Sequence, residues 1–247
     1  MRSEIQQLAD VQALYEAAAA AFDGAVREAV RDRGICRVAL AGGSTPNGLY
    51  ARLARDPWRG RLPWDAIEVF WGDERHVPPD HPDSNYQMAA GALLSRVPIP
   101  AARIHRVLAE DPDPEAAAAA YEAEVRAAFA TPDGVPQFDL ILLGLGSDGH
   151  TASLFPETSA LAERQRLVVA NWVRAMNTHR ITLTLPVLNA ARVVLFMVAG
   201  ADKATAVHAV LQGGSSAPLP AALVQPSSGR LVWLLDTAAA RLLQGAP

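Results

Sequence analysis

The sequence contains a single cysteine among its 247 residues, Cys36, so the chain cannot form an intramolecular disulfide. It has no apolar run long enough to cross a bilayer. Its first ten residues carry charges and contain no apolar signal core. Together these absences predict a protein of the reducing cytoplasm, without a membrane partner.

Charge is also sparse, since 19% of the residues are charged and the formal net charge is -4. A broad nucleic-acid-binding surface needs an excess of basic residues, so we expect no nucleic-acid partner, although a local basic pocket remains compatible with this balance. No cluster of Cys, His and carboxylate residues has metal-ligand spacing, which predicts no catalytic metal. The chain also lacks both the full P-loop with its lysine and the GxGxxG fingerprint of dinucleotide-binding folds.

Half of the residues are hydrophobic, and they gather in runs that alternate between strand-like and helix-like patterns. Strands are predicted at 36–43, 66–74, 138–146, 166–173, 180–188, 191–200 and 230–236. Helices are predicted at 4–33, 45–54, 83–97, 113–129 and 201–213, with a loop-rich link at 215–229. This alternation predicts an α/β fold with a mostly parallel sheet and helices on both faces, formed by one domain over residues 1–247.

Ligands of open α/β sheets bind beyond the carboxyl ends of the strands, and the first such end here reads "AGGSTP". Gly42 and Gly43 permit close backbone approach, Ser44 and Thr45 supply hydroxyls, and the next helix directs free N–H groups at the loop. The stretch therefore predicts an anion site. The alternative is a tight glycine turn followed by a helix that Thr45 caps and Pro46 begins.

The second strand end reads "FWGDERH" and brings Asp73, Glu74 and Arg75 together. An arginine here could bind phosphate oxygens in a fork, and a carboxylate could accept hydrogen bonds from sugar hydroxyls. The alternative is a solvated charge cluster with an internal ion pair.

The third strand end reads "LLGLGSDGHTASLFP", in which glycines at 144, 146 and 149 allow a sharp turn before His150. We expect His150 near the first turn of a helix, where the helix dipole disfavours imidazolium and keeps the ring able to accept a proton. A neutral histidine is a competent general base near pH 7, and Asp148 could orient its ring. The alternative is a capping aspartate beside an uninvolved histidine.

Two further cations are candidates: Arg180 begins the strand-like run "RITLTLP", and Lys203 lies in "GADKA", at a strand-to-helix junction. Both fit a pocket for anionic ligands, although exposure at the surface is the commoner fate of such residues.

Taken together, five motifs resemble the 6-phosphogluconolactonases, in the family that these enzymes share with the glucosamine-6-phosphate isomerases. The motifs are "LAGGSTP" (40–46), "FWGDERHVPPDHPDSNYQMA" (70–89), "DLILLGLGSDGHTASLFP" (139–156), "RITLTLPVLNAA" (180–191) and "GADKA" (200–204). They occur in order over most of the chain, and the second and third are long and specific.

The resemblance implies a modified Rossmann-like sheet, as in sugar-phosphate isomerases and coenzyme A transferases. It implies hydrolysis of 6-phosphoglucono-δ-lactone without a cofactor, the second step of the oxidative pentose phosphate pathway. His150 would activate water, and Asp73 and Arg75 would lie at the substrate. The Gly42–Thr45 loop, Arg180 and Lys203 would form the anion-holding side, with the cation that meets the phosphate left open. We expect a monomer, with a weak dimer as the alternative.

Two rival functions use the same scaffold. A glucosamine-6-phosphate deaminase resembles this chain at the Asp-Gly-His turn but places a glutamate where "GHTASLFP" has Phe155, and phenylalanine cannot relay protons. A non-catalytic sugar-phosphate-binding regulator would keep the glycine-rich loop and the cations but would not need His150.

Overall fold

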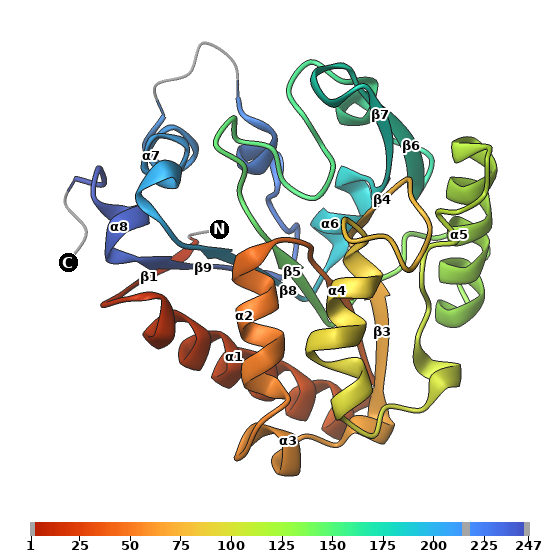
Figure 1. Ribbon diagram of the computed structural model, residues 1–247, viewed down its shortest axis with the longest axis horizontal. Helices are drawn as coiled ribbons and strands as arrows, with labels where there is room; N and C mark the ends of the chain where they lie inside the picture. The colour runs from red at the N-terminus through yellow and green to blue at the C-terminus, as the bar shows by residue number, and fades with distance from the viewer. Residues whose placement is uncertain (1–2, 214–217, 245–247) are drawn as a thin grey trace.

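The computed structural model describes residues 3–213 and 218–244, and its core is a sheet of six parallel strands in the order β1-β9-β8-β5-β2-β3 (Figure 1). A smaller antiparallel sheet has the order β4-β7-β6. The larger sheet consists of β1 (Glu4–Leu8), β2 (Cys36–Leu40), β3 (Ile67–Trp71), β5 (Leu140–Leu143), β8 (Val193–Val198) and β9 (Arg230–Asp236). The smaller sheet consists of β4 (Asp73–Arg75), β6 (Val168–Val173) and β7 (Thr178–Leu183).

Helices cover both faces of the larger sheet, as the sequence predicted. The steps from β1 to β2 and from β2 to β3 run toward one edge, whereas the later steps to β5, β8 and β9 run toward the other. Because parallel crossovers are right-handed, this reversal puts α1 and α2 on one face and α6 and α7 on the other (Figure 1). The helices are α1 (Val11–Arg33), α2 (Ser44–Leu53), α3 (Trp58–Arg61), α4 (Asn85–Ala92), α5 (Pro114–Phe129), α6 (Leu185–Ala190), α7 (Ala204–Gln212) and α8 (Thr237–Ala240).

The first predicted helix, 4–33, is wrong at its start, because residues 4–8 form the edge strand β1. The Asp10 carboxylate accepts a hydrogen bond from the Ala13 N–H at 2.8 Å and so begins α1. Gly34, with a left-handed φ of 75°, ends it. Strand β1 is exposed along nearly all its length, so no buried face of period two marks it in the sequence.

Two predicted strands are divided in the structure. The run 66–74 breaks at Gly72, whose N–H donates to Leu40 in the larger sheet and whose carbonyl accepts from Leu183 in the smaller one, both at 2.9 Å. The run 180–188 ends as a strand at Leu183, and α6 follows because Pro186 suits the first turn of a helix. The chain thus passes between sheets at Gly72.

Two buried tyrosines fix the backbone where β2 and β3 end. The Tyr50 hydroxyl, from α2, donates to the Ala41 carbonyl at 2.8 Å and accepts from its N–H at 2.9 Å. The Tyr121 hydroxyl, from α5, does the same at Trp71, at 3.0 and 2.8 Å. Each hydroxyl replaces a missing partner strand, so the chain leaves the sheet in a defined direction.

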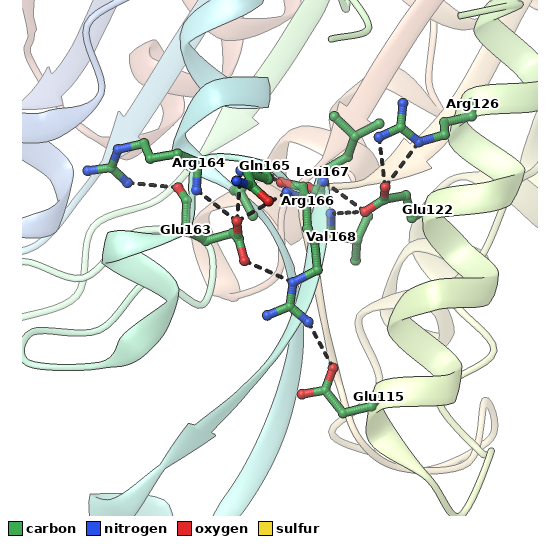
Figure 2. A network of polar contacts seen from close by, with 10 residues as sticks. Glu115, Glu122, Arg126, Glu163, Arg164, Gln165, Arg166, Leu167 and Val168 are labelled. Atoms are coloured by element: carbon green, nitrogen blue, oxygen red, sulfur yellow. Dashed lines mark hydrogen bonds and ion pairs between the residues drawn. The ribbon is translucent and has the colours of Figure 1, made fainter. Parts of the chain in front are cut away.

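A polar network fixes the start of β6 against α5 (Figure 2). One Glu122 oxygen accepts from the N–H groups of Leu167 and Val168 at 2.8 and 3.1 Å. Arg166, just before them, donates to Glu115 at 3.1 Å. Helix α5 therefore holds the smaller sheet through carboxylates on one side of the helix.

The predicted link 215–229 lies partly outside the described residues, at 215–217, and the rest contains a short 3-10 turn, Pro220–Leu223. Within residues 3–213 and 218–244, no helix combines the length and the apolar character needed to cross a membrane.

Candidate active site

A cavity of about 220 Å³ opens at the carboxyl ends of β2, β5 and β8. The order of the strands reverses between β2 and β5, so the loops after these strands part and leave room for a ligand. The structure brings eight of the predicted site residues to the wall of this cavity. They are Gly42, Gly43, Ser44, Thr45, Asp73, Arg75, His150 and Lys203.

The glycine-rich loop leads straight into α2, and the helix begins one residue earlier than predicted. Gly43 is the N-cap, so Thr45 lies inside the first turn and does not cap the helix. No side chain in the described part of the protein caps this end. The amide groups of Ser44 and Thr45 therefore face the cavity with the positive end of the helix dipole, which favours an anion.

His150 lies in a tight turn, and the predicted helix after it is wrong. The Gly146 N–H donates to the His150 carbonyl at 2.8 Å, and both Gly149 and Ala152 have left-handed φ angles, of 81° and 49°. These angles are incompatible with a right-handed helix. The helix dipole that was expected to keep the ring neutral is therefore absent at His150.

Asp148 supplies one of these neighbours. Its Oδ1 lies 2.5 Å from Nδ1 of His150 and also accepts from the His150 N–H at 3.1 Å. A carboxylate can only accept, so in the neutral ring this contact assigns the proton to Nδ1 and leaves Nε2 with a free lone pair. Burial acts to raise the pKa of Asp148, but the hydrogen bonds from His150 and the charge of its ring outweigh this and lower the pKa below its ordinary value.

Phe155 covers the ring of His150. The two rings stack with their centroids 4.1 Å apart and an angle of 24° between their planes. Phe155 is buried, so it restricts rotation of the imidazole and presents no ionisable group to it.

Asp73 and Arg75 enter the cavity from β4. Asp73 is buried, and its Oδ2 accepts from the Ser153 hydroxyl at 2.6 Å. Arg75 donates through Nη1 to the Asp83 carbonyl at 2.5 Å, while its buried Nε has no hydrogen-bond partner among the described residues. A buried guanidinium N–H without a partner is costly, and an anionic ligand in the cavity could satisfy it.

Glu74, between them, points away from the cavity. Its two oxygens accept from the backbone N–H groups of Arg75, Asn85 and Tyr86 and from the Ser84 hydroxyl, at 2.7 to 3.1 Å. Burial raises the pKa of Glu74 above its ordinary value, although these backbone hydrogen bonds oppose the effect. Glu74 thus fastens the start of α4 to β4.

The two remaining cations differ in their positions. Lys203, the only lysine in the sequence, lines the cavity after β8 and lies 3.2 Å from an oxygen of Asp202. Arg180 does not line the cavity; it pairs with Arg75 across β4 and β7, and its Nη2 contacts the Met176 sulfur at 3.2 Å. Burial, and then the charge of Arg75, lower the pKa of Arg180.

Sequence reasoning missed two residues that hold Asp73. Asn85 donates to the Asp73 carbonyl at 2.8 Å, and Ser153 binds its carboxylate. Both lie inside the motifs quoted above, but their contacts join segments that are far apart in the sequence. Among residues 3–213 and 218–244, no group of three or more His, Cys, Asp or Glu side chains could hold a metal ion.

A family model described as glucosamine-6-phosphate isomerases/6-phosphogluconolactonase matches residues 9–233. The chain belongs to this family. The 6-phosphogluconolactonase of Synechocystis sp. is 44% identical over 246 residues, which cover 99% of this chain and 100% of that protein. The prediction of an enzyme of this family is thereby confirmed.

Solved structures of the family share the fold. The 6-phosphogluconolactonase from Trypanosoma cruzi superposes with a TM-score of 0.87 at 28% identity, covering 99% of this chain and 98% of that one. A monomeric glucosamine-6-phosphate deaminase superposes with a TM-score of 0.80, covering 97% and 100% of the two chains, but at 21% identity it speaks for the fold alone. The predicted Rossmann-like α/β fold is confirmed.

Proposed function

We propose that this protein hydrolyses 6-phospho-D-glucono-1,5-lactone to 6-phospho-D-gluconate, with His150 as the general base. The observation that carries the proposal is the contact of His150 with Asp148, because it leaves Nε2 as the acceptor on a histidine that lines the anion-favouring cavity. As part of the same proposal, the reaction is the second step of the oxidative pentose phosphate pathway, takes place in the cytoplasm, needs no cofactor, and is carried out by a monomer formed of one domain.

In the first step, Nε2 of His150 takes a proton from a water molecule as the water oxygen attacks the lactone carbonyl carbon. The carbonyl π electrons move to the oxygen, and donors in the cavity stabilise the resulting oxyanion. Asp148 keeps its hydrogen bond to Nδ1 and stabilises the imidazolium that forms.

In the second step, the tetrahedral intermediate collapses and the bond from the carbonyl carbon to the ring oxygen breaks. The imidazolium gives its proton to this oxygen, which becomes the free hydroxyl of the product, and His150 returns to its neutral form. The phosphate at the far end of the substrate supplies binding energy that fixes the lactone in place. Arg75, Lys203 and the start of α2 offer positive charge for the phosphate and the oxyanion.

The contact between His150 and Phe155 favours hydrolysis over the deaminase reaction. A phenyl ring stacks on the base at the position where the rival family would place a glutamate, so no carboxylate at this position can relay protons for ring opening and isomerisation.

The test follows acid release from freshly made lactone at pH about 7, because the lactone also hydrolyses spontaneously. We expect the protein to accelerate release well above this background in proportion to its concentration. A folded protein that leaves the background rate unchanged would refute the proposed function.

A further inference from the structure

Ser153 occupies a special place in the turn after His150, because its three polar groups bind the three strands of the smaller sheet. Its N–H donates to the Thr182 hydroxyl in β7 at 3.2 Å. Its carbonyl accepts from Nδ2 of Asn171 in β6 at 2.8 Å. Its hydroxyl donates to Oδ2 of Asp73 in β4 at 2.6 Å. Ser153 is itself buried, as are all three partners.

These contacts join two parts of the cavity wall that belong to different sheets. His150 and Ala152 follow strand β5 of the larger sheet, whereas Asp73 belongs to the smaller one. Ala152 has a left-handed φ of 49°, which an alanine adopts only where its surroundings enforce it. The hydrogen bonds of Ser153, the next residue, supply that constraint.

The Ser153 hydroxyl also makes the two oxygens of the Asp73 carboxylate unequal. Oδ2 is engaged by the short hydrogen bond from Ser153, whereas Oδ1 accepts only a long one, at 3.4 Å, from Asn85 among the described residues. Oδ1 thus keeps acceptor capacity for a ligand hydroxyl. Because a buried hydroxyl donor fixes one oxygen, the plane of the carboxylate is fixed as well.

We infer that Ser153 is a positioning residue of the reaction, which holds the Asp73 carboxylate in register with His150 and fixes the direction in which Oδ1 meets the sugar. This inference rests on the proposed function. The turn that contains His150 is then held in place by its hydrogen bonds to the smaller sheet.

The variant Ser153→Ala removes the hydroxyl and leaves both backbone hydrogen bonds in place. We expect kcat/KM for the lactone to fall roughly 10- to 100-fold, because a small misplacement of a substrate contact has effects of this size. Binding of 6-phosphogluconate, measured by calorimetry, should weaken as well.

Ser84→Ala is the matched control, since Ser84 is also a buried serine whose hydroxyl donates to a carboxylate, that of Glu74 at 3.1 Å. Neither Ser84 nor Glu74 lines the cavity. We expect Ser84→Ala to lower the unfolding temperature at least as much as Ser153→Ala, with kcat/KM changed less than about twofold. Equal losses of kcat/KM in the two variants would show a merely structural role and overturn the inference.

A double-mutant cycle with Asp73→Ala tests the route of the effect. If the Ser153 hydroxyl acts through Asp73, adding Ser153→Ala to Asp73→Ala should lower kcat/KM by less than about twofold more. If the fold-losses of kcat/KM in the two single variants multiply in the double variant, the two residues act independently and the inference is contradicted. Activity of the unaltered protein is the reference, so a failure of the proposed function shows there and not in the cycle.

Thr182→Val provides a second test of the inference if the Ser153→Ala protein does not fold. It is nearly isosteric and removes the hydroxyl that accepts from the Ser153 N–H at 3.2 Å and donates to the Leu183 carbonyl at 3.0 Å. We expect a smaller loss of kcat/KM, roughly threefold to tenfold, in a protein with an unchanged circular dichroism spectrum. Full activity in this variant would count against the docking of the turn on the smaller sheet.

Discussion

At the scale of single residues, the site works through the neighbours of His150. Asp148 holds the proton on Nδ1, Phe155 covers one face of the ring, and the backbone of Gly146 holds the carbonyl. Each contact restricts a different freedom of the side chain, so Nε2 is directed before a substrate arrives. These contacts, and not the start of a helix as the sequence led us to expect, define the position of the ring.

Replacing His150 with alanine separates a lactonase from a sugar-phosphate-binding regulator. We expect kcat/KM to fall by about 10²- to 10⁴-fold, because the base is lost, while 6-phosphogluconate still binds within a few-fold of its original affinity. Acid-release kinetics and calorimetry measure the two effects. Unchanged catalysis in the variant would remove His150 from the mechanism.

Arg75 and Lys203 reach the cavity from different elements, and their roles can be separated by kinetics. A cation that meets the oxyanion acts in the transition state, so its loss lowers kcat, whereas a cation that holds the phosphate binds substrate and transition state alike, so its loss raises KM. We expect one of the variants Arg75→Ala and Lys203→Met to lower kcat and the other to raise KM, each by about tenfold or more. The same pattern in both variants would show that the two cations share one task.

At the scale of elements, the predictions succeed where a segment is buried or capped by its own residues. Strands β5 and β8 are fully buried apolar runs, and α5 follows its capping residue Asp113. Each of these elements can therefore be predicted from the sequence. Strand β1 was missed because it is exposed. The turn after His150 was missed because contacts to the smaller sheet, not local propensity, fix its left-handed angles.

The turn from Gly144 to His150 requires a glycine at position 146. A Cβ there would lie 2.0 Å from Nδ1 of His150 and 2.6 Å from Oδ1 of Asp148, so both side chains would have to move. We expect Gly146→Ala to lower kcat/KM by about 10²-fold while the protein remains folded.

Gly24→Ala, in α1, is the control. No described atom outside the local helix backbone lies within 4 Å of the added Cβ, and alanine should stabilise the helix by about 0.5–1 kcal/mol without affecting activity. A fully active Gly146→Ala protein would mean that the turn adapts and that the observed position of His150 is not required.

The segment before β6 carries a carboxylate with a strongly lowered pKa. Hydrogen bonds from the Gln165 N–H, the Arg166 side chain and the Arg166 N–H lower the pKa of Glu163 to about 2 (Figure 2). Because the folded pKa is depressed, the carboxylate stabilises the fold above its ordinary pKa of about 4.5, and this contribution is lost as pH falls toward 2.

We therefore expect Glu163→Gln to be less stable than the unaltered protein by about 1–2 kcal/mol at pH 6, with the difference vanishing near pH 2. Denaturant unfolding across this range measures it. Glu115→Gln removes a largely exposed partner of Arg166 and should change stability by less than about 0.5 kcal/mol. A constant difference at all pH values would assign the effect to packing.

At the scale of the whole molecule, the two sheets depend on each other. Gly72 is hydrogen-bonded to both, and Ser153 docks a loop of the larger sheet on every strand of the smaller one. The sequence indicates neither link, because each joins residues distant in the chain. What the sequence does provide is the order of elements and the motifs at the strand ends, from which the family and most of the cavity wall follow.

We propose that the two sheets unfold together as one domain. Trp71 and Trp233 report on the larger sheet and Trp172 on the smaller, so tryptophan fluorescence and far-ultraviolet circular dichroism should give coincident denaturation curves. Two separate transitions would show independent units. A variant that keeps only Trp172, with the other tryptophans replaced by phenylalanine, would show which transition belongs to the smaller sheet.

The single lysine of the sequence has a practical consequence. Its ε-amino group lies at the cavity, with about a quarter of the side chain exposed and a carboxylate beside it. Reagents selective for amines therefore have one side-chain target in the whole protein, and that target lines the cavity. Covalent labelling becomes a readout of occupancy: a bound phosphorylated sugar should shield the amine, and a fluorophore attached there would sense ligand entry directly.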